Sequence, residues 1–247
     1  IASALFDGAK SSVGIISSCA CAGIVIGVLS LTGAGLKFAQ MVLALSHGNL
    51  LPALALSAVA SLVLGMGLPT TASYLICAAV AAPALVELGV PPLAAHMFIF
   101  YYACISAITP PVALAAYAGA GLAKANPMRV GTTAVRLGLV AYIVPFMFVY
   151  GPPLLAQGSL GSILWAAITA IVGVGALAMG IEGWIGNRGI GIVARALLVV
   201  ASLTLIKPGL MTDMIGLGLF AVVPVAGRAS EMFRRRNQAT ADTQAPR

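Results

Sequence analysis

A break containing glycine, proline and threonine interrupts an apolar region of the sequence. It reads Gly65-Met-Gly-Leu-Pro-Thr-Thr-Ala72 and lies between apolar stretches at 50–64 and 72–86, each of which is short for a bilayer crossing. Glycine permits positive φ and close backbone approach, which we expect at Gly65 and Gly67. The carbonyls near these glycines, together with the threonine hydroxyls, suit a hard cation such as Na⁺.

The residues after Pro69 in the same break suit an anion. Thr70 or Thr71 is a good N-cap for the helix that follows. The N-terminus of that helix carries partial positive charge and free N–H donors. The break therefore offers a cation site before Pro69 and an anion site after it, and the threonine hydroxyls can serve either.

A second break, Ser106-Ala-Ile-Thr-Pro-Pro111, repeats this chemistry. Its two prolines remove two N–H donors and disfavour helix at Thr109, so we expect helix to resume at Val112. The carbonyls and hydroxyls from Ser106 to Thr109 then become available as ligands. A proline kink in an ordinary helix is the alternative. Freed backbone groups are tolerated in lipid only inside protein or beside water, so two such breaks indicate a transport site near the membrane midplane.

Few other residues in this region could carry chemistry. His96 is either a proton carrier or a residue at the interface that bonds a neighbouring helix. Glu87 stands beside a Gly-Val-Pro-Pro turn and should be solvated, and Asp213 should be interfacial. An enzyme would need a nucleophile, a base and an orienting group. The candidates are Ser73, Ser106, His96 and Glu87, and the enzyme alternative would require an essential His96 with Ser106. Neither G-x-S-x-G nor H-E-x-x-H occurs. We expect no enzyme and no cofactor.

The composition is that of an integral membrane protein. Hydrophobic residues make up 61% of the chain and charged residues 8%, where a soluble domain carries about a quarter charged residues. The net charge of +7 does not indicate nucleic acid, because the Lys and Arg residues lie at the ends of apolar segments. The sequence begins at Ile1 without a methionine, and we interpret it as the C-terminal part of a longer polypeptide.

The lengths of the apolar segments predict which of them span the membrane. A span needs about 20 apolar residues, and the segments at 11–32, 132–155 and 159–181 qualify. Segments 191–206 and 208–226 qualify as a pair if Lys207 and Pro208 form a tight turn. The stretch at 34–47 is expected to be a short connecting or interfacial helix.

Basic residues set the orientation. The positive-inside rule places the C-terminus in the cytoplasm, because four arginines lie near it: Arg228, Arg234, Arg235 and Arg236. Counting backward places Lys124, Arg129 and Arg136 inside and the turn at 89–92 outside. The two arms at 50–64 and 72–88 then enter from outside as a re-entrant hairpin, unless they are two ordinary spanning helices joined by a turn.

Three stretches together resemble the large membrane subunit of TRAP (tripartite ATP-independent periplasmic) transporters: Gly65–Tyr74, Ala82–His96 and Ser106–Tyr117. Ala20–Val28 and Leu31–Gly33 are most similar to the TAXI-type branch, whose small and large membrane subunits are fused. No G-x-x-x-x-G-K-[ST] occurs, which agrees with transport independent of ATP.

The resemblance implies an all-α polytopic fold that holds the second inverted repeat of an elevator-type transporter. A transport domain at 34–125 would contain a connecting helix, a re-entrant hairpin at 50–88 and a broken helix at 93–122. The remaining parts would be a scaffold transmembrane helix at 1–33, a transmembrane helix at 126–158, a three-helix membrane extension at 159–227 and a disordered basic cytoplasmic tail at 228–247.

The resemblance also implies a function: symport of an organic acid anion into a bacterium through its inner membrane. A periplasmic solute-binding protein would deliver a dicarboxylate, a 2-oxo acid or a glutamate-like solute, and Na⁺ or H⁺ would drive uptake. Further partners would be membrane lipid and the N-terminal half and small-subunit region of the same chain, with no nucleic acid. A non-transporting channel or scaffold subunit with kinked helices is the alternative.

The candidate site residues come from the two breaks. The cation would bind Gly65, Gly67, Thr70 and Thr71 of the hairpin tip, which would face Ser106 and Thr109 of the broken helix. The anion would bind Thr71, Pro110, Pro111 and Val112, because helix N-termini favour negative charge there. No metal other than a transported Na⁺ is expected.

Overall fold

The computed structural model describes residues 2–185, 188–206, 209 and 211–222. The expected turn at Lys207–Pro208 and the basic tail at 228–247 lie outside the described residues. The chain divides into two compact units, Ile1–Val149 and Tyr150–Arg247, which are described separately below. The first holds both breaks of the sequence.

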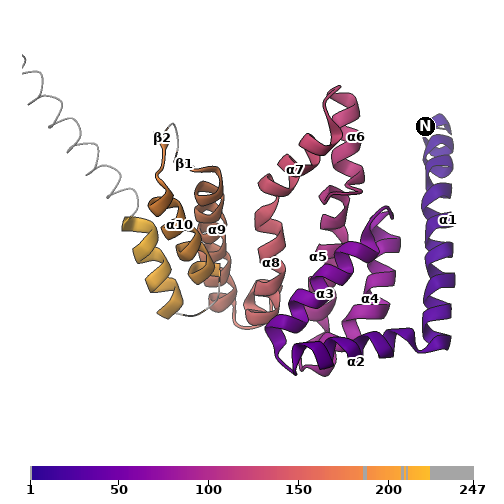
Figure 1. Cartoon of the computed structure of the whole chain (residues 1–247), viewed down its shortest axis with the longest axis horizontal. Helices are drawn as coiled ribbons and strands as arrows, with labels where there is room; N and C mark the ends of the chain where they lie inside the picture. Colours follow the sequence, from indigo (N-terminus) through magenta and orange to yellow (C-terminus); the bar gives the residue numbers. More distant parts are fainter. Residues whose placement is uncertain (1, 186–187, 207–208, 210, 223–247) are drawn as a thin grey trace, which may run out of the picture. The chain divides into compact units, whose positions relative to one another are not determined.

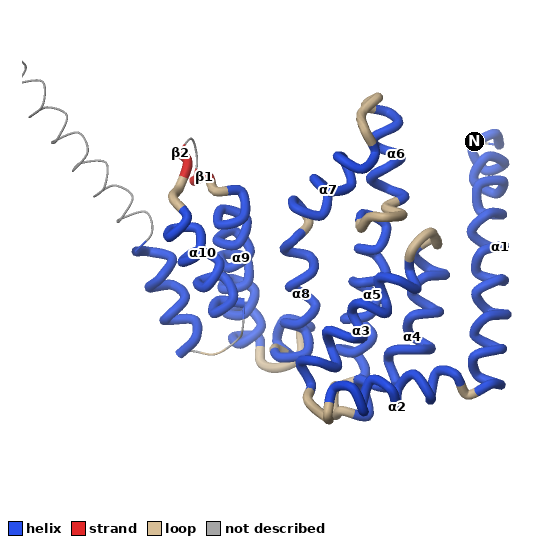
Figure 2. The backbone as a smooth tube through the Cα atoms, viewed as in Figure 1, coloured by secondary structure: helices blue, strands red, loops and turns tan. Residues whose placement is uncertain are grey.

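Unit 1 is built from helices that end where glycine and proline interrupt the chain (Figures 1 and 2). They are α1 (Ala2–Thr32), α2 (Ala34–Ser46), α3 (Leu50–Gly65), α4 (Thr70–Glu87), α5 (Pro92–Ile105), the 3₁₀ turn η1 (Ser106–Ile108), α6 (Leu114–Leu122), α7 (Pro127–Leu137) and α8 (Leu139–Tyr150). Gly33 stands between α1 and α2 at φ 64°, and the axes there are bent by 70°. The expected short helix at 34–47 is confirmed as α2.

Helices α3 and α4 are the two arms of a hairpin that packs against α5. The buried side chains of this packing include Leu54 of α3, Leu85 of α4, and Phe98 and Ile99 of α5. The tip turns at Gly67, whose φ of 81° is readily available only to glycine. The hairpin expected from the sequence is therefore present as a structural element.

The two arms differ in length. Helix α3 has 16 residues, but α4 has 18 and is long and apolar enough to cross a membrane by itself. The expectation that both arms are short is therefore wrong for α4. Thr70 and Thr71 belong to this helix because Pro69 occupies its N-cap position with φ −58° and ψ 146°.

The segment predicted to span the membrane at 132–155 is bent rather than continuous. Two helices, α7 and α8, meet at Gly138 with a bend of 41°, and α8 ends at Tyr150; together they are long and apolar enough for one span. A Cβ at Gly138 would lie 2.9 Å from Ile108 Cδ1 and 3.0 Å from the Ala134 carbonyl oxygen. The close approach of Ile108 therefore favours a glycine at this point, and glycine also weakens the helix.

Unit 2 begins with the 3₁₀ turn η2 (Pro152–Leu155). Three helices follow: α9 (Leu160–Glu182), α10 (Ile192–Ile206) and a helix at Met211–Val222. Helix α9 is long and apolar enough to span a membrane, as predicted for 159–181. Two short strands that the sequence did not predict, β1 (Trp184–Ile185) and β2 (Arg188–Gly189), pair antiparallel between α9 and α10. Arg195 of α10 donates to the Gly180 and Ile181 carbonyls at the end of α9.

Asp213 is buried in unit 2 rather than interfacial. Its side chain is 1% exposed, and its Oδ2 accepts a hydrogen bond of 2.7 Å from Trp165 Nε1 of α9. The sequence interpretation failed because the indole that shields the carboxylate lies 48 residues earlier in the chain.

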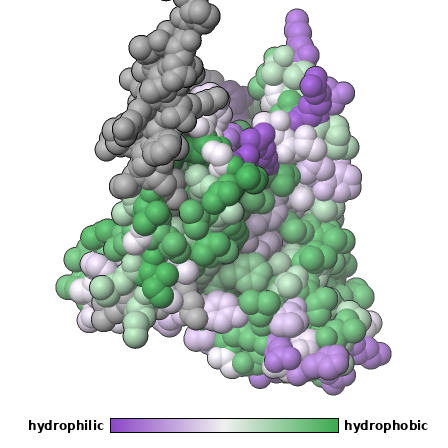
Figure 3. All heavy atoms as spheres, turned by 60° about the vertical axis from the view of Figure 1, so that its left-hand side comes forward, coloured by the Kyte–Doolittle hydropathy of each residue, from purple (hydrophilic) through white to green (hydrophobic). Residues whose placement is uncertain are grey.

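Large apolar side chains are exposed on many of the helices. Leu31 is 91% exposed and Leu122 is 89% exposed. On the face drawn in Figure 3, hydrophobic side chains cover much of the surface that is coloured. This distribution is expected of a surface that contacts lipid. Among the described residues, two helices can span a membrane alone, and up to four spans result if each bent helix pair counts as one.

Candidate functional site

The hairpin tip and the helix break meet at Gly65. A Cβ at this position would lie 2.6 Å from Ser73 Oγ of α4 and 2.7 Å from Ser106 Oγ of η1. At Gly67 a Cβ would lie 3.6 Å from Val112 Cγ1. The structure thus brings Gly65 and Gly67 of the first break against Ser106 and Val112 of the second, and a Cβ at Gly65 would displace the Ser73 and Ser106 hydroxyls.

Buried hydroxyl groups lie on the elements that form this contact. Ser73 lies beside Gly65, and Ser61 and Ser57 lie one and two turns further along α3. All three are fully buried, and their Oγ atoms bond no nitrogen or oxygen among the described residues; the Cys77 thiol is a weak partner for Ser61 and Ser73. Ser106 is 1% exposed, and its Oγ donates to the Ala103 carbonyl at 2.6 Å. An unpartnered buried hydroxyl costs about 1–3 kcal/mol, so oxygen atoms of this kind are suited to a ligand that accepts their lone pairs.

Sequence reasoning missed Ser57 and Ser61, and it named Ser73 only as a candidate for an enzyme site, not as a ligand. A signal for the first two was present, because Ser57, Ser61 and Gly65 follow one another at intervals of four residues and so share one face of a helix. Ser73 gave no such signal. Its position beside Gly65 depends on how α3 folds back onto α4.

The break between α5 and α6 is longer than expected. Helix resumes at Leu114 rather than at Val112, because Ala113 adopts a left-handed conformation with φ 32°. Pro110 is half-buried and Pro111 exposed in the non-helical segment. The prediction that the proline pair interrupts the helix is confirmed, and the expected restart at Val112 is wrong.

Thr109 is tied to two other elements. Its Oγ1 donates to the Ile105 carbonyl at 2.8 Å and shares a hydrogen bond of 2.6 Å with Tyr142 Oη of α8. Tyr102 Oη of α5 donates to the Tyr142 carbonyl at 2.5 Å. Hydrogen bonds to Tyr142 of α8 therefore join this helix both to α5 and to the break. The Thr109 hydroxyl therefore holds the break in place and has partners within the protein.

Thr70 and Thr71 lie in the first turn of α4 and are exposed. Neither side chain makes a hydrogen bond among the described residues, and the expected capping role is wrong because Pro69 is the N-cap residue. The first N–H groups of a helix have no intrahelical partner. The α4 N-terminus therefore remains favourable for an anion next to the hairpin tip.

His96 bonds a neighbouring helix. Its Nδ1 lies 2.9 Å from Tyr74 Oη, which joins α5 to α4, and Glu87 is exposed as expected. No group of three His, Cys, Asp or Glu side chains in the described part of the chain is placed to hold a metal ion. The chemistry available at the tip is consequently that of hydroxyl and carbonyl oxygens.

The comparison with protein families agrees with this arrangement of hairpin and broken helix. The profile of the family described as "Tripartite ATP-independent periplasmic transporter, DctM component" matches residues 1–163. The chain belongs to the DctM family. It is therefore a multi-pass inner-membrane permease component of a TRAP transporter, and the family is one of transporters rather than enzymes. The DctM match covers all of unit 1 and ends in the first turn of α9.

No curated protein and no solved structure matches the chain. The DctM assignment thus rests on the family profile.

Proposed function

We propose that this DctM permease imports organic acid anions, delivered by a periplasmic binding protein, and couples their uptake to a cation gradient, with Na⁺ as the coupling ion. The solute would be a dicarboxylate, a 2-oxo acid or a glutamate-like compound, and the chain would be part of a fused permease of the TAXI type. The observation that carries the proposal is the contact of the hairpin tip with the helix break at Gly65.

The proposed cation ligands are oxygen atoms around Gly65. The last carbonyls of a helix lack intrahelical partners and carry partial negative charge, and those of α3 end at the tip. The Oγ atoms of Ser73 and Ser106 lie beside them. Hydroxyl and carbonyl oxygens without a carboxylate suit a monovalent hard cation better than a proton.

The proposed anion site adjoins the cation site. The N-terminus of α4 at Thr70 and Thr71 would attract the solute's carboxylate. The non-helical residues Pro110, Pro111 and Val112 would line the same region, because Val112 faces Gly67 of the tip. A cation bound at Gly65 would strengthen anion binding by Coulomb attraction, which is the physical basis of symport.

The proposed movement carries the hairpin and the broken helix together. Buried side chains of α3, α4 and α5 form a shared core, and Tyr74–His96 adds a hydrogen bond between two of these helices. Such a packed body can slide past a scaffold without separating the tip from the break. This is the elevator mode, in which the site crosses with its ligands bound.

Uptake by the complete permease and its binding protein in liposomes tests the proposal. A sodium gradient and then a proton gradient are imposed, with a panel of labelled dicarboxylates, 2-oxo acids and glutamate. Sodium-driven uptake of at least one anion is the expected result. Uptake driven only by protons would discard the Na⁺ site and make His96 and Glu87 the residues to examine.

A further inference from the structure

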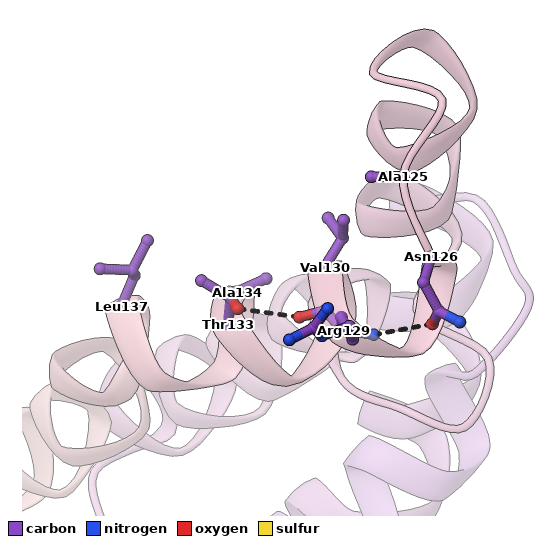
Figure 4. A pocket seen from close by; sticks show the side chains of 7 residues that line it. All are labelled: Ala125, Asn126, Arg129, Val130, Thr133, Ala134 and Leu137. Atoms are coloured by element: carbon purple, nitrogen blue, oxygen red, sulfur yellow. Dashed lines mark hydrogen bonds between the residues drawn. The ribbon is translucent and has the colours of Figure 1, made fainter.

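A groove runs along one face of α7, separate from the hairpin tip. It has a volume of about 530 Å³, and Figure 4 shows side chains from the turn before α7 and from successive turns of that helix along it. Its lining residues are Ala125, Asn126, Arg129, Val130, Thr133, Ala134 and Leu137. Their spacing of three or four residues places them on a single helix face.

The N-terminal end of the groove is cationic. Arg129 is exposed and forms no ion pair with any described residue. Asn126 Oδ1 accepts the Arg129 backbone N–H at 3.2 Å, which leaves the Asn126 amide NH₂ as a further donor (Figure 4). Lys124 lies in the preceding turn, and no Asp or Glu occurs between Glu87 and Glu182. The chain therefore supplies positive charge here without a nearby carboxylate in its sequence.

The C-terminal end of the groove is apolar. Val130, Ala134 and Leu137 line it, and Leu137 is 65% exposed. The 11 residues of α7 extend over about 16 Å, which is close to half of the hydrocarbon thickness of a bilayer. A ligand that fills the groove thus needs an anionic head and an apolar chain of that length.

We propose that this groove binds an anionic phospholipid of the membrane. The lipid phosphate contacts the Arg129 guanidinium and the Asn126 amide, and one acyl chain lies along Val130, Ala134 and Leu137. A membrane protein meets this ligand at high local concentration, and a basic residue near the membrane surface attracts such headgroups. A free anion would use only one end of the groove.

Native mass spectrometry of the purified full-length permease tests the lipid site. Phosphatidylglycerol and phosphatidylcholine are titrated in parallel at equal concentrations. Wild-type protein should retain phosphatidylglycerol in preference to phosphatidylcholine. Arg129→Gln should reduce that preference about fivefold, since one basic residue near a lipid surface contributes about that factor. Thr133→Glu, which places a carboxylate in the groove, should reduce it at least as far.

Lys37→Gln is the matched control. It removes one positive charge from an exposed residue of α2 in the same unit, outside the groove, and should leave the lipid preference unchanged. The lipid site is refuted if Arg129→Gln and Thr133→Glu keep the wild-type preference, or if Lys37→Gln loses as much. Displacement of phosphatidylglycerol by equimolar inorganic phosphate would also refute it, because the apolar end would then contribute nothing.

Discussion

Buried polar groups differ in chemistry between the two units. In unit 1 they include the hydroxyls of Ser57, Ser61 and Ser73, which bond no nitrogen or oxygen among the described residues, and Ser73 lies beside Gly65 of the hairpin tip. In unit 2 the Asp213 carboxylate accepts from Trp165, although its Oδ1 has no partner, and the Arg195 guanidinium donates to two carbonyls of α9. Unit 2 thus uses its polar groups mainly for contacts between its own helices.

This difference indicates where ligand chemistry resides. Unpartnered buried oxygens destabilise a fold unless something else binds them, so the Ser73 hydroxyl beside Gly65 supports a ligand site there. The DctM profile covers unit 1 completely and reaches only the first turn of α9. Substitutions at the hairpin tip and the helix break of unit 1 should therefore alter cation coupling, whereas those in unit 2 should alter stability alone.

The largest effect is expected at the contact point. Gly65→Ala would place a methyl group 2.6 Å from Ser73 Oγ and 2.7 Å from Ser106 Oγ, and would push the tip away from the break. Overpacking of this kind costs about 1–3 kcal/mol, so we expect sodium-driven uptake in liposomes to fall by about a hundredfold. Gly119→Ala is the control, since nothing lies within 4 Å of a Cβ at Gly119. Equal losses in both variants would contradict a specific role for the tip.

A smaller loss is expected from removing one ligand oxygen. Ser73→Ala should weaken the apparent sodium affinity of uptake about tenfold, in line with the value of a hydrogen-bonding group to a charge. The same change should not destabilise the sodium-free protein, because the lost hydroxyl bonds no nitrogen or oxygen among the described residues.

Ser46→Ala serves as the control for Ser73→Ala. Ser46 is also buried, but its Oγ donates to the Leu43 carbonyl of its own helix, so its loss should leave the sodium affinity unchanged. The ligand assignment fails if Ser73→Ala keeps the wild-type sodium dependence.

A substitution in unit 2 should lower the stability of the protein without changing the sodium dependence of uptake. Trp165→Phe removes the donor to Asp213 and leaves the buried carboxyl oxygen without its partner. We expect the free energy of unfolding to fall by about 1–3 kcal/mol, measured by thermal denaturation in detergent, with an unaltered sodium dependence of uptake. A shifted sodium dependence would show that the extension takes part in coupling.

The smallest effect is expected between α4 and α5. Tyr74→Phe deletes the hydrogen bond to His96 and keeps the ring that packs edge-on against Phe100. Hydrogen bonds between membrane helices contribute about 0.6 kcal/mol on average, so the melting temperature should change only slightly. A collapse of proton-dependent activity would instead favour a proton-carrying role for His96.

The sequence was sufficient to predict the hairpin and the broken helix, because Gly67, Pro69 and the pair Pro110–Pro111 act on the local backbone. It was not sufficient for features that depend on distant neighbours. A single glycine in an apolar run does not by itself end a helix, and the bend at Gly138 depends on Ile108 approaching from another element. The Ser73 hydroxyl likewise becomes part of the site only when α3 folds back onto α4.

Capping residues show a second limit of sequence reasoning. Thr70 and Thr71 are good N-cap residues in general, yet Pro69 takes that position here. Proline fixes its own φ and cannot donate, so it begins the helix and leaves both threonines exposed in the first turn. Threonine is favoured at the N-cap in general, but in α4 the N-cap position falls on Pro69, the residue before Thr70.

Sodium-dependent thermal stability of the purified permease tests the central claim most directly, because it requires no knowledge of the solute. A ligand that binds only the folded state raises its stability as concentration increases. The melting temperature of the wild-type protein should rise with NaCl but not with choline chloride at equal ionic strength. The Ser73→Ala/Ser106→Ala double variant should lose that rise. An equal rise in the double variant, or none in the wild type, would contradict a sodium site between the hairpin tip and the helix break.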